Sequence, residues 1–319
     1  MKAPETPADE AKRLATLRAL GVLDTAAEER FDRLTRMAKR LFRVPIALVS
    51  LVDENRQWFK SCMGLATNET SRDISFCGHA ILGDDIFIIP DTLADARFAD
   101  NPLVVGEPYI RFYAGCPLHA ANGTKVGTLC VVDSLPREFD QDDAQALHDL
   151  ALMVEAELIA FQAATTDELT GISNRRGFRL LAQYSLNFCA RQALPVSLAF
   201  LDLDKFKSIN DCHGHAVGDQ ALAAFAEQMR ASFRSADLLA RLGGDEFVVL
   251  LSDAGRERAQ AAVDKFTRNL DAYNDAAGQP YRLAFSDGIV ELDPERHFSI
   301  EALLAEGDTL MYAIKGAKK

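Results

Sequence analysis

The N-terminal half of the chain shows two kinds of hydrophobic spacing. Before residue 45, apolar residues recur every three or four positions, which predicts two amphipathic helices. Their apolar positions are Leu14, Leu17 and Leu20, ahead of Gly21, and then Phe31, Leu34, Met37 and Leu41. Beyond Pro45, apolar stretches separated by polar turns predict strands at 46–52, 57–63, 112–121 and 126–132. The Asn122-Gly123 pair predicts a hairpin between the last two, so we expect an antiparallel sheet with flanking helices.

A continuous helix is predicted for 140–166, which contains no Gly or Pro. Leu147, Val154 and Phe161 lie seven positions apart, and Ala151, Leu158 and Thr165 fill the second heptad position. Two interpretations fit this spacing: a coiled coil with a second chain, or a long helix packed on its own domain. In both, the helix links the two halves mechanically.

The C-terminal half alternates between helical and strand patterns. Helices are predicted at 174–192, from 205, from 216, around Val263 to Tyr273, and at 300–314. Strands are predicted at 196–203, 238–242, 246–251 and 281–290. The order βααββαβ is that of a ferredoxin-like sheet with added helices. We therefore expect an α+β protein with an N-terminal helical segment (1–27), a first domain (28–139), a linker helix (140–166) and a second domain (167–319).

Composition and charge narrow the function classes. The chain has 319 residues, 48% hydrophobic and 26% charged, which is typical of a globular protein of about two domains. The formal charge of −12 argues against a broad basic surface, so neither nucleic acid nor membrane is an expected partner. No apolar run has the roughly 18 residues of a membrane helix, and the first residues show no signal peptide. Six scattered cysteines without a CxxC pair favour reduced thiols and a cytoplasmic location.

Acidic residues lie at the end of the predicted strand 196–203 and at the start of the strand that begins at 246. Asp202 ends the first, and Asp245-Glu246 follows Gly243-Gly244. If the two strands are neighbours, these carboxylates meet at one sheet edge, where oxygen ligands suit Mg²⁺. Glycines at the turn allow a tight hairpin and close approach of a ligand to the backbone. The alternative is a surface hairpin with solvated acids.

Four segments of the C-terminal half occur in a characteristic order, at 167–176, 202–210, 214–219 and 241–247. Over residues 167 to about 316 they resemble the GGDEF domain of diguanylate cyclases. The resemblance implies a fold related to polymerase palms and the reaction 2 GTP → cyclic di-GMP + 2 pyrophosphate. It also implies a homodimer with one GTP per subunit, and Mg²⁺ as cofactor, with Mn²⁺ able to substitute. Hydrolysis of the product is not expected.

The same resemblance implies a role for individual residues. The metal ligands would be Asp202, Asp245, Glu246 and the carbonyl of Leu203, with Asp245 and Glu246 catalytic and Glu246 alternatively the base for the 3′-hydroxyl. Asn210 and Asp219 would read guanine. The other substrate contacts would be His215, Lys207, Gly243, Gly244 and Lys315. Each also has a structural interpretation: Asn210 and Asp219 as helix caps, His215 as a loop residue, and Lys315 as a last-turn lysine.

Two further features belong to this resemblance. Arg234 and Asp237 stand five residues before Gly243, the spacing of the family's RxxD product-inhibition motif. The alternative is a solvated Arg–Asp pair at a helix end. At the C-terminus, Lys319 stands where the family often has an arginine that contacts phosphate. A lysine lacks the bidentate fork, so weaker substrate binding is expected.

The N-terminal half resembles a GAF sensor domain over residues 28 to about 160. The segments that carry this resemblance are 46–53, 74–79, 89–98, 113–118 and 126–133. GAF domains bind varied small molecules, so the fold implies an unknown signal. Cys77 with His79, and Cys116 with His119, are candidate metal or haem ligands, and Cys77 is a candidate bilin site. Buried core cysteines are the preferred interpretation, and Trp58 is expected in the core.

Three functions follow from these patterns. The favoured one is a diguanylate cyclase controlled by its GAF domain and by its product. The alternatives are a degenerate GTP or cyclic di-GMP binding module without cyclase activity, and a scaffold in which the GAF domain drives dimerisation.

Overall fold

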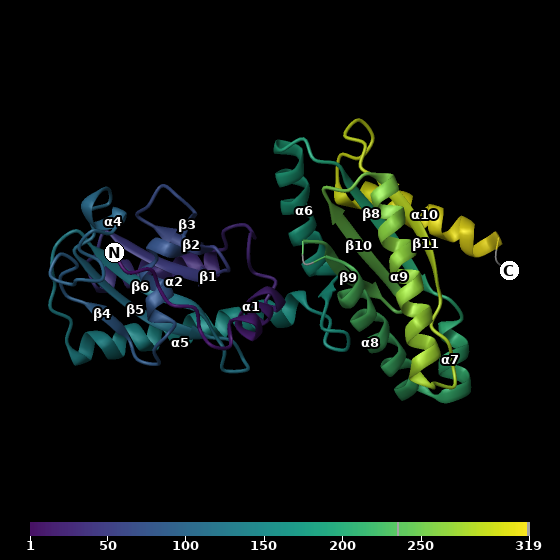
Figure 1. Ribbon diagram of the computed structural model, residues 1–319, viewed down its shortest axis with the longest axis horizontal. Coiled ribbons are helices and arrows are strands. Elements are labelled where there is room, and N and C mark those ends of the chain that lie inside the picture. Colours follow the sequence, from purple (N-terminus) through teal and green to yellow (C-terminus); the bar gives the residue numbers. More distant parts are fainter. Residues whose placement is uncertain (235, 318–319) are drawn as a thin grey trace. The chain divides into compact units, whose positions relative to one another are not determined.

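The computed structural model describes residues 1–234 and 236–317, so the expectation for Lys319 lies outside the described residues. The chain divides into two compact units, Met1–Gln162 and Ala163–Lys319 (Figure 1). Within the described part of the chain, none of the helices combines the length and apolar character needed to cross a membrane.

The N-terminal unit is built on a six-stranded antiparallel sheet in the order β3-β2-β1-β6-β5-β4. Its strands are β1 Ile46–Val52, β2 Arg56–Met63, β3 Glu69–Ser71, β4 Phe87–Ile89, β5 Phe112–His119 and β6 Lys125–Asp133. Its helices are α1 Glu10–Ala19, α2 Glu29–Leu41, η1 Arg72–Ile74, α3 Phe76–Ala80, α4 Pro102–Val105 and α5 Gln141–Thr165. The antiparallel sheet with flanking helices is confirmed.

The two faces of this sheet build separate cores. Odd-numbered residues of β1, such as Val49, pack with α1, α2, α5 and Trp58, which is 7% exposed. Even-numbered residues, such as Leu48, pack with α3 and the segments around it. The short elements β3, β4, α3 and α4 escaped prediction because three to five residues show no hydrophobic period.

The heptad positions of α5 are occupied by the N-terminal core itself. Leu147, Val154 and Phe161 are at most 2% exposed and pack in the core that contains β1 and β6, as do Ala151 and Leu158. That seam is therefore closed to a second chain. The interpretation as a helix packed on its own domain is confirmed, and the coiled coil along this seam is wrong.

The C-terminal unit contains a five-stranded sheet in the order β11-β8-β10-β9-β7. The strands are β7 Ser173–Asn174, β8 Val196–Leu203, β9 Leu238–Gly243, β10 Glu246–Ser252 and β11 Phe285–Glu291. The helices are α6 Arg175–Arg191, α7 Phe206–His213, α8 His215–Ser232, α9 Arg256–Ala277 and α10 Ile300–Ala317. One face packs on α8 and α9, and the other on α6 and α10. The predicted order βααββαβ is confirmed.

Two details of this unit differ from the sequence-based expectation. The unpredicted β7 pairs in parallel with β9 at the sheet edge. The last strand begins at Phe285 instead of 281, because the Asn274 side chain binds both backbone groups of Leu283, at 2.8 Å each. Leu283 therefore joins no β-ladder.

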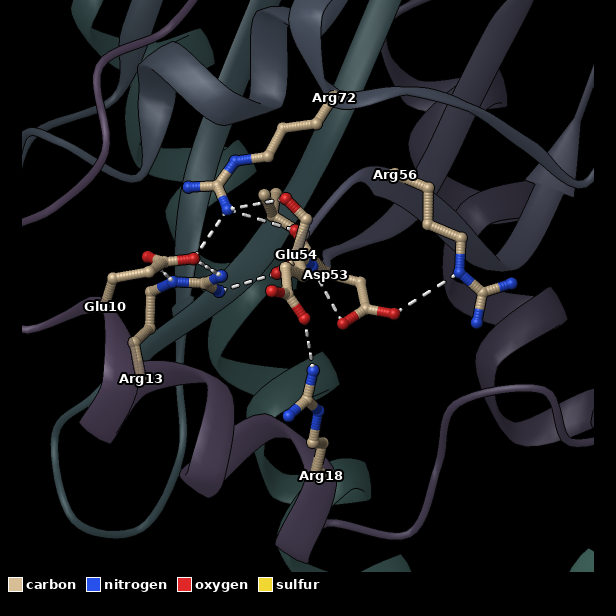
Figure 2. A network of polar contacts seen from close by, with 8 residues as sticks. Glu10, Arg13, Arg18, Asp53, Glu54, Arg56 and Arg72 are labelled. Atoms are coloured by element: carbon tan, nitrogen blue, oxygen red, sulfur yellow. Dashed lines mark hydrogen bonds and ion pairs between the residues drawn. The ribbon is translucent and has the colours of Figure 1, made fainter. Parts of the chain in front are cut away.

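A charged network holds α1 to the turn between β1 and β2 (Figure 2). Arg13, which is 2% exposed, donates to the Val52 carbonyl at 2.6 Å and to both oxygens of Glu10 at 2.7 Å. Arg72 donates to the same carboxylate and to the carbonyls of Asp53 and Glu54. Burial opposes ionisation of Glu10, but the hydrogen bonds from Arg13 and Arg72 outweigh it and lower its pKa from 4.5 to about 2.

We expect Glu10→Gln to destabilise the N-terminal unit at neutral pH. A carboxylate with a lowered folded-state pKa adds stability that is complete above pH 4.5 and is lost as the pH falls toward 2. The loss at pH 7 should be as much as roughly 3 kcal/mol, and the acid slope should flatten in the variant. Urea unfolding of the full chain at several pH values measures both. Glu5→Gln, at an exposed Lys2–Glu5 pair, should change little; equal effects of the two variants would contradict the role of the network.

Candidate functional site

The antiparallel register of β8 and β10 brings the two acidic segments together. Glu246 lies directly opposite Asp202, and on the other side of β8, Ser286 of β11 is opposite Asp202 as well. Directly opposed residues of antiparallel strands share one sheet face. Asp202 is 8% exposed at this position. The expectation that the two strands are neighbours is confirmed, and with it the meeting of the acids at one sheet edge.

The hairpin between β9 and β10 places Asp245 against the end of β8. Gly243 has φ +149° and Gly244 has φ +51°, values that side chains disfavour. The backbone amide of Leu203 donates to the carbonyl of Asp245 at 3.1 Å. The hairpin and the end of the acidic strand are thus joined directly through the backbone.

Arg241 fixes the same hairpin from the other side. Its Nε donates to the Gly244 carbonyl at 2.9 Å, and its Nη1 donates to the two carboxylate oxygens of Asp167 at 3.2 and 3.3 Å. Asp167 also accepts from the backbone amide and hydroxyl of Thr170. Neither Arg241 nor Asp167 is among the site residues expected from the sequence. Both lie within the four segments that carry the family resemblance, and this position could have indicated that they have a role.

The charges at the site are strongly interdependent. Burial raises the pKa of Asp202, the Lys315 ammonium opposes that shift, and the carboxylate of Asp245 adds to it. Burial also raises the pKa of Glu246, whose nearest cation is Arg175 at 3.6 Å. Burial disfavours the charge of Lys315, but the hydrogen bond to Asp202 and the negative charges of the nearby aspartates together outweigh burial and raise the pKa of Lys315. Lys315, expected to contact phosphate, here pairs with an expected metal ligand.

The oxygen donors at the strand end fit a cation that is completed by a substrate. The carboxylate of Asp245 is close enough to that of Asp202 to raise the pKa of Asp202, and the Leu203 amide binds the Asp245 carbonyl. Among residues 1–234 and 236–317, no group of three or more His, Cys, Asp or Glu side chains forms a complete metal cage. Mg²⁺ does not need one, because it is commonly bound by one or two carboxylates plus substrate phosphates.

A cavity of about 800 Å³ opens beside these donors. Leu203, Asp245 and Lys315 line it together with Lys207 of α7. Lys205 and Arg282 add two further cations to its wall. The structure therefore brings expected metal and phosphate contacts into one basic cavity, which has the charge to hold a polyphosphate.

The two expected guanine contacts come from the paired helices α7 and α8. A Cβ at Gly218 would lie 1.9 Å from Oδ1 of Asn210, so only glycine lets the Asn210 side chain lie this close to α8. Asp219 follows directly and is exposed, as is His215. Because α8 begins at His215 and α7 spans Phe206–His213, neither Asp219 nor Asn210 is a helix cap. The capping interpretation is wrong for both, and His215 is in a helix instead of a loop.

Arg234 and Asp237 form a turn ahead of β9, at the opposite end of that strand from Gly243. The Asp237 carboxylate accepts from the backbone amide of Arg234 at 2.9 Å, and the Asp237 amide donates to the Arg234 carbonyl at 3.0 Å. Burial raises the pKa of Asp237. Asp237 thus has a local structural role, and the Arg234 side chain is exposed.

The candidate ligand pairs of the N-terminal unit do not converge. Cys77 Sγ lies 3.9 Å from Cys130 Sγ, whereas His79 contacts the Lys2 carbonyl. Cys116 Sγ is 3.7 Å from the ring of His148. His119 instead bonds the carboxylate of Glu155 at 2.8 Å.

One tripeptide has the letters of the phosphodiesterase motif and was passed over in the sequence analysis. Glu301-Ala302-Leu303 begins α10, where Leu303 is fully buried in the C-terminal core. Glu301 lies 3.4 Å from Arg179 of α6. These residues therefore serve helix packing in this unit.

Comparison with protein-family models gives two matches. Residues 164–319 match the model "Diguanylate cyclase, GGDEF domain", and residues 26–158 match the GAF domain. The match to the diguanylate cyclase DgcP of Escherichia coli K12 is 32% identical over 277 residues, covering 78% of this chain and 76% of that protein.

Three other similarities have narrower scope. A cyclic di-GMP phosphodiesterase of Pseudomonas aeruginosa is 34% identical over 92% of this chain, which spans only 50% of that protein's length. The probable diguanylate cyclase DgcE of Escherichia coli K12 is 34% identical over 66% of this chain, equal to 18% of its own length. The coiled coil and GGDEF domain of DgcB from Caulobacter crescentus, solved with c-di-GMP, has a TM-score of 0.50 at 22% identity, covering 55% of this chain and 92% of that one, and shows the fold.

We expect Arg241→Met to loosen the β9–β10 hairpin without unfolding the unit. The variant keeps the aliphatic side chain but loses the hydrogen bonds to Gly244 and Asp167. Amide hydrogen exchange at 243–246 should accelerate about tenfold or more, the effect of losing a charged hydrogen bond. Arg258→Met removes an exposed arginine whose carboxylate partner is 3.8 Å away and should leave exchange there unchanged. Unchanged exchange in Arg241→Met would show that the hairpin is stable without the hydrogen bonds of Arg241.

Proposed function

The chain belongs to the family of diguanylate cyclases with a GGDEF domain, and on this premise we propose that it condenses two GTP into cyclic di-GMP and two pyrophosphates. The observation that supports the proposal best is the register of β8 and β10. It sets Asp202 opposite Glu246, while the hairpin holds Asp245 against Leu203. The chain spans about half the length of the first curated relative it matches. The cyclase activity is therefore proposed for these 319 residues.

We assign the metal site to Asp202, Asp245 and the carbonyl of Leu203, with Mg²⁺ as the cofactor and Mn²⁺ as a substitute. When bound, Mg²⁺ supplies charge that stabilises the reacting phosphate and the departing pyrophosphate. Lys315 exchanges its partner Asp202 for the triphosphate, and Lys207 of the same cavity adds a second cation. Glu246, whose pKa burial raises, is the second carboxylate available as ligand or as base for the 3′-hydroxyl.

Guanine recognition is assigned to Asn210 and Asp219. An exposed carboxylate accepts hydrogen bonds from both N1–H and the exocyclic amine of guanine, a pair of donors that adenine lacks. Gly218 sets the position of Asn210 relative to α8, which carries Asp219. His215 at the start of α8 and the glycines of the hairpin complete the proposed substrate contacts.

The reaction joins two nucleotides, so it requires two copies of the chain. Each copy holds one GTP, and the alignment of the two sites sets the rate. We assign control of that alignment to the GAF domain. The supporting observation is α5, which runs without interruption from the N-terminal core at Leu147 to Thr165, whose carbonyl abuts Gly177 of the C-terminal unit.

Hydrolysis of cyclic di-GMP is not part of the proposal. The phosphodiesterase name belongs to a relative twice as long as the matched region. The tripeptide Glu301-Ala302-Leu303 lies in α10, where Leu303 is a core residue.

Purified chain incubated with GTP and Mg²⁺ is expected to form cyclic di-GMP, and Asp245→Ala should form it at least a hundredfold more slowly. Removing a metal ligand forfeits several kcal/mol of charge stabilisation, each 1.4 kcal/mol being tenfold in rate. Chromatographic product analysis gives both rates, and Asp264→Asn on exposed α9 serves as the matched control. Product no higher than the Asp245→Ala background would identify a binding module instead. Equal use of ATP would contradict the role of Asp219.

We further propose that cyclic di-GMP inhibits the enzyme at Arg234 and Asp237. Arginine can grip phosphate and stack on guanine, and this turn lies at the far end of β9 from the hairpin. Arg234→Ala should keep the initial rate, bind cyclic di-GMP about tenfold or more weakly, and give a higher final yield. Calorimetry and progress curves measure these effects, with Arg268→Ala on the exposed side of α9 as control. Wild-type progress curves unaffected by added product would refute the assignment.

A further inference from the structure

The N-terminal unit contains a cavity of about 630 Å³. Its walls come from β1, β2, β5 and β6 on the sheet side, and from α3 and residues 103–110 on the other. Most of the lining is apolar, as at Leu48, Phe59 and Phe76. Two cysteines line it from opposite sides, Cys130 of β6 and Cys77 of α3.

These cysteines face each other within a buried polar cluster. Their Sγ atoms are 3.9 Å apart, and the Tyr113 hydroxyl donates to Cys77 Sγ at 3.4 Å. All three residues are at most 2% exposed. The hydroxyls of Ser50 and Thr128, which are opposed on β1 and β6, are also buried and have no hydrogen-bond partner among the described residues.

The backbone makes room for this arrangement. Gly115 of β5 is paired with Cys130 of β6, and a Cβ at Gly115 would lie 2.2 Å from the Tyr113 hydroxyl. The missing side chain therefore lets the phenol extend along the sheet to the thiols. A polar, sulfur-containing patch is in this way set into an otherwise aromatic and aliphatic core.

The two thiols differ in their readiness to ionise. Hydrogen bonding from Cys130, together with smaller contributions that include Tyr113, lowers the pKa of Cys77 despite its burial. The same interaction raises the pKa of Cys130. A thiolate beside a protonated thiol is the combination in which one sulfur attacks and the other resolves.

We propose that Cys77 and Cys130 form a redox-active dithiol, which small hydroperoxides entering this cavity oxidise to a disulfide. The Cys77 thiolate attacks the peroxide O–O bond, giving Cys77 sulfenic acid and an alcohol or water that takes up the proton released by Cys77. The Cys130 sulfur then displaces the hydroxyl, which leaves as water with the Cys130 proton. Overall, two thiols and one hydroperoxide give one disulfide, one alcohol (or water) and one water.

The geometry sets what must move. A disulfide holds its sulfurs about 2 Å apart, so the Sγ atoms must approach each other from 3.9 Å. Cys77 lies on the five-residue helix α3, and the cavity beside it leaves space for its side chain to rotate. Cys130 is in the middle of the central strand β6 and is the fixed partner.

The other cysteines lack this combination. Burial raises the pKa of Cys116 to about 12. Cys189 is buried in the C-terminal core, and Cys212 is exposed on α7. Cys62 donates weakly to the carbonyls of Leu65 and Thr67, and burial raises its pKa. Oxidation that simply followed exposure would modify Cys212 first.

The test is oxidation of the reduced full chain with about one equivalent of hydrogen peroxide, followed by alkylation and peptide mapping. The expected result is a Cys77–Cys130 cross-linked peptide pair, reversed by dithiothreitol, while Cys212 is still alkylated. Tyr113→Phe should slow cross-linking several-fold, and Cys212→Ser should leave its rate unchanged. In Cys130→Ser, dimedone should label Cys77.

Three outcomes would overturn the proposal: Cys77 and Cys130 remaining free while Cys212 is oxidised, Cys77 cross-linking to another cysteine, or Cys212→Ser abolishing the reaction. The wild-type peptide map decides the matter by itself should Cys130→Ser fail to fold. None of these results depends on whether the C-terminal unit makes cyclic di-GMP.

Discussion

The backbone pairing of β8 with β10 is the constraint on which the C-terminal site depends. A one-residue slip of β10 would carry Glu246 to the opposite face from Asp202 and would turn Val248 and Leu250 out of the core they share with α6 and α10. The buried apolar residues therefore determine the register, and the register in turn determines where the carboxylates meet. The geometry of the proposed site therefore follows from core packing, and Arg241 and the hairpin glycines fix it further.

Carboxylates gathered at one sheet edge repel one another. Cations from three other segments offset this repulsion. Lys315 of α10 binds Asp202, Arg175 of α6 lies beside Glu246, and Arg241 binds Asp167. Each cation is positioned by a helix or strand that packs for independent reasons. A bound polyphosphate and its metal ion would replace some of these ion pairs with contacts to the ligand. We expect Lys315 to change partner most between the free and the ligand-bound protein.

The two faces of the sheet in the N-terminal unit differ: one is covered by long helices, and the other bears a cavity with polar and sulfur-containing side chains. The face covered by α1, α2 and α5 is mainly apolar, although it also buries Lys60, and it holds the helix that continues toward the second unit. The opposite face bears the cavity, the paired thiols and the two unpartnered hydroxyls. Because both faces share β1 and β6, Cys130 lies on a strand whose other face packs in the same core as Leu147 and Val154.

The sequence by itself determined the long periodic elements, the ferredoxin-like order, the recurring motifs and hence the family, since these depend on local spacing and residue type. It also supplied the proposed site residues, although not which of them lie together. Only tertiary structure decided that Lys315 binds Asp202, that Arg241 joins the first motif to the hairpin, and that Gly218 positions Asn210. The spacing alone could not decide what the heptad positions of α5 pack against. A coiled coil and a helix packed on its own domain need the same row of apolar residues along the helix. Cys77 and Cys130, 53 positions apart, became a pair only through strand register and the missing side chain of Gly115.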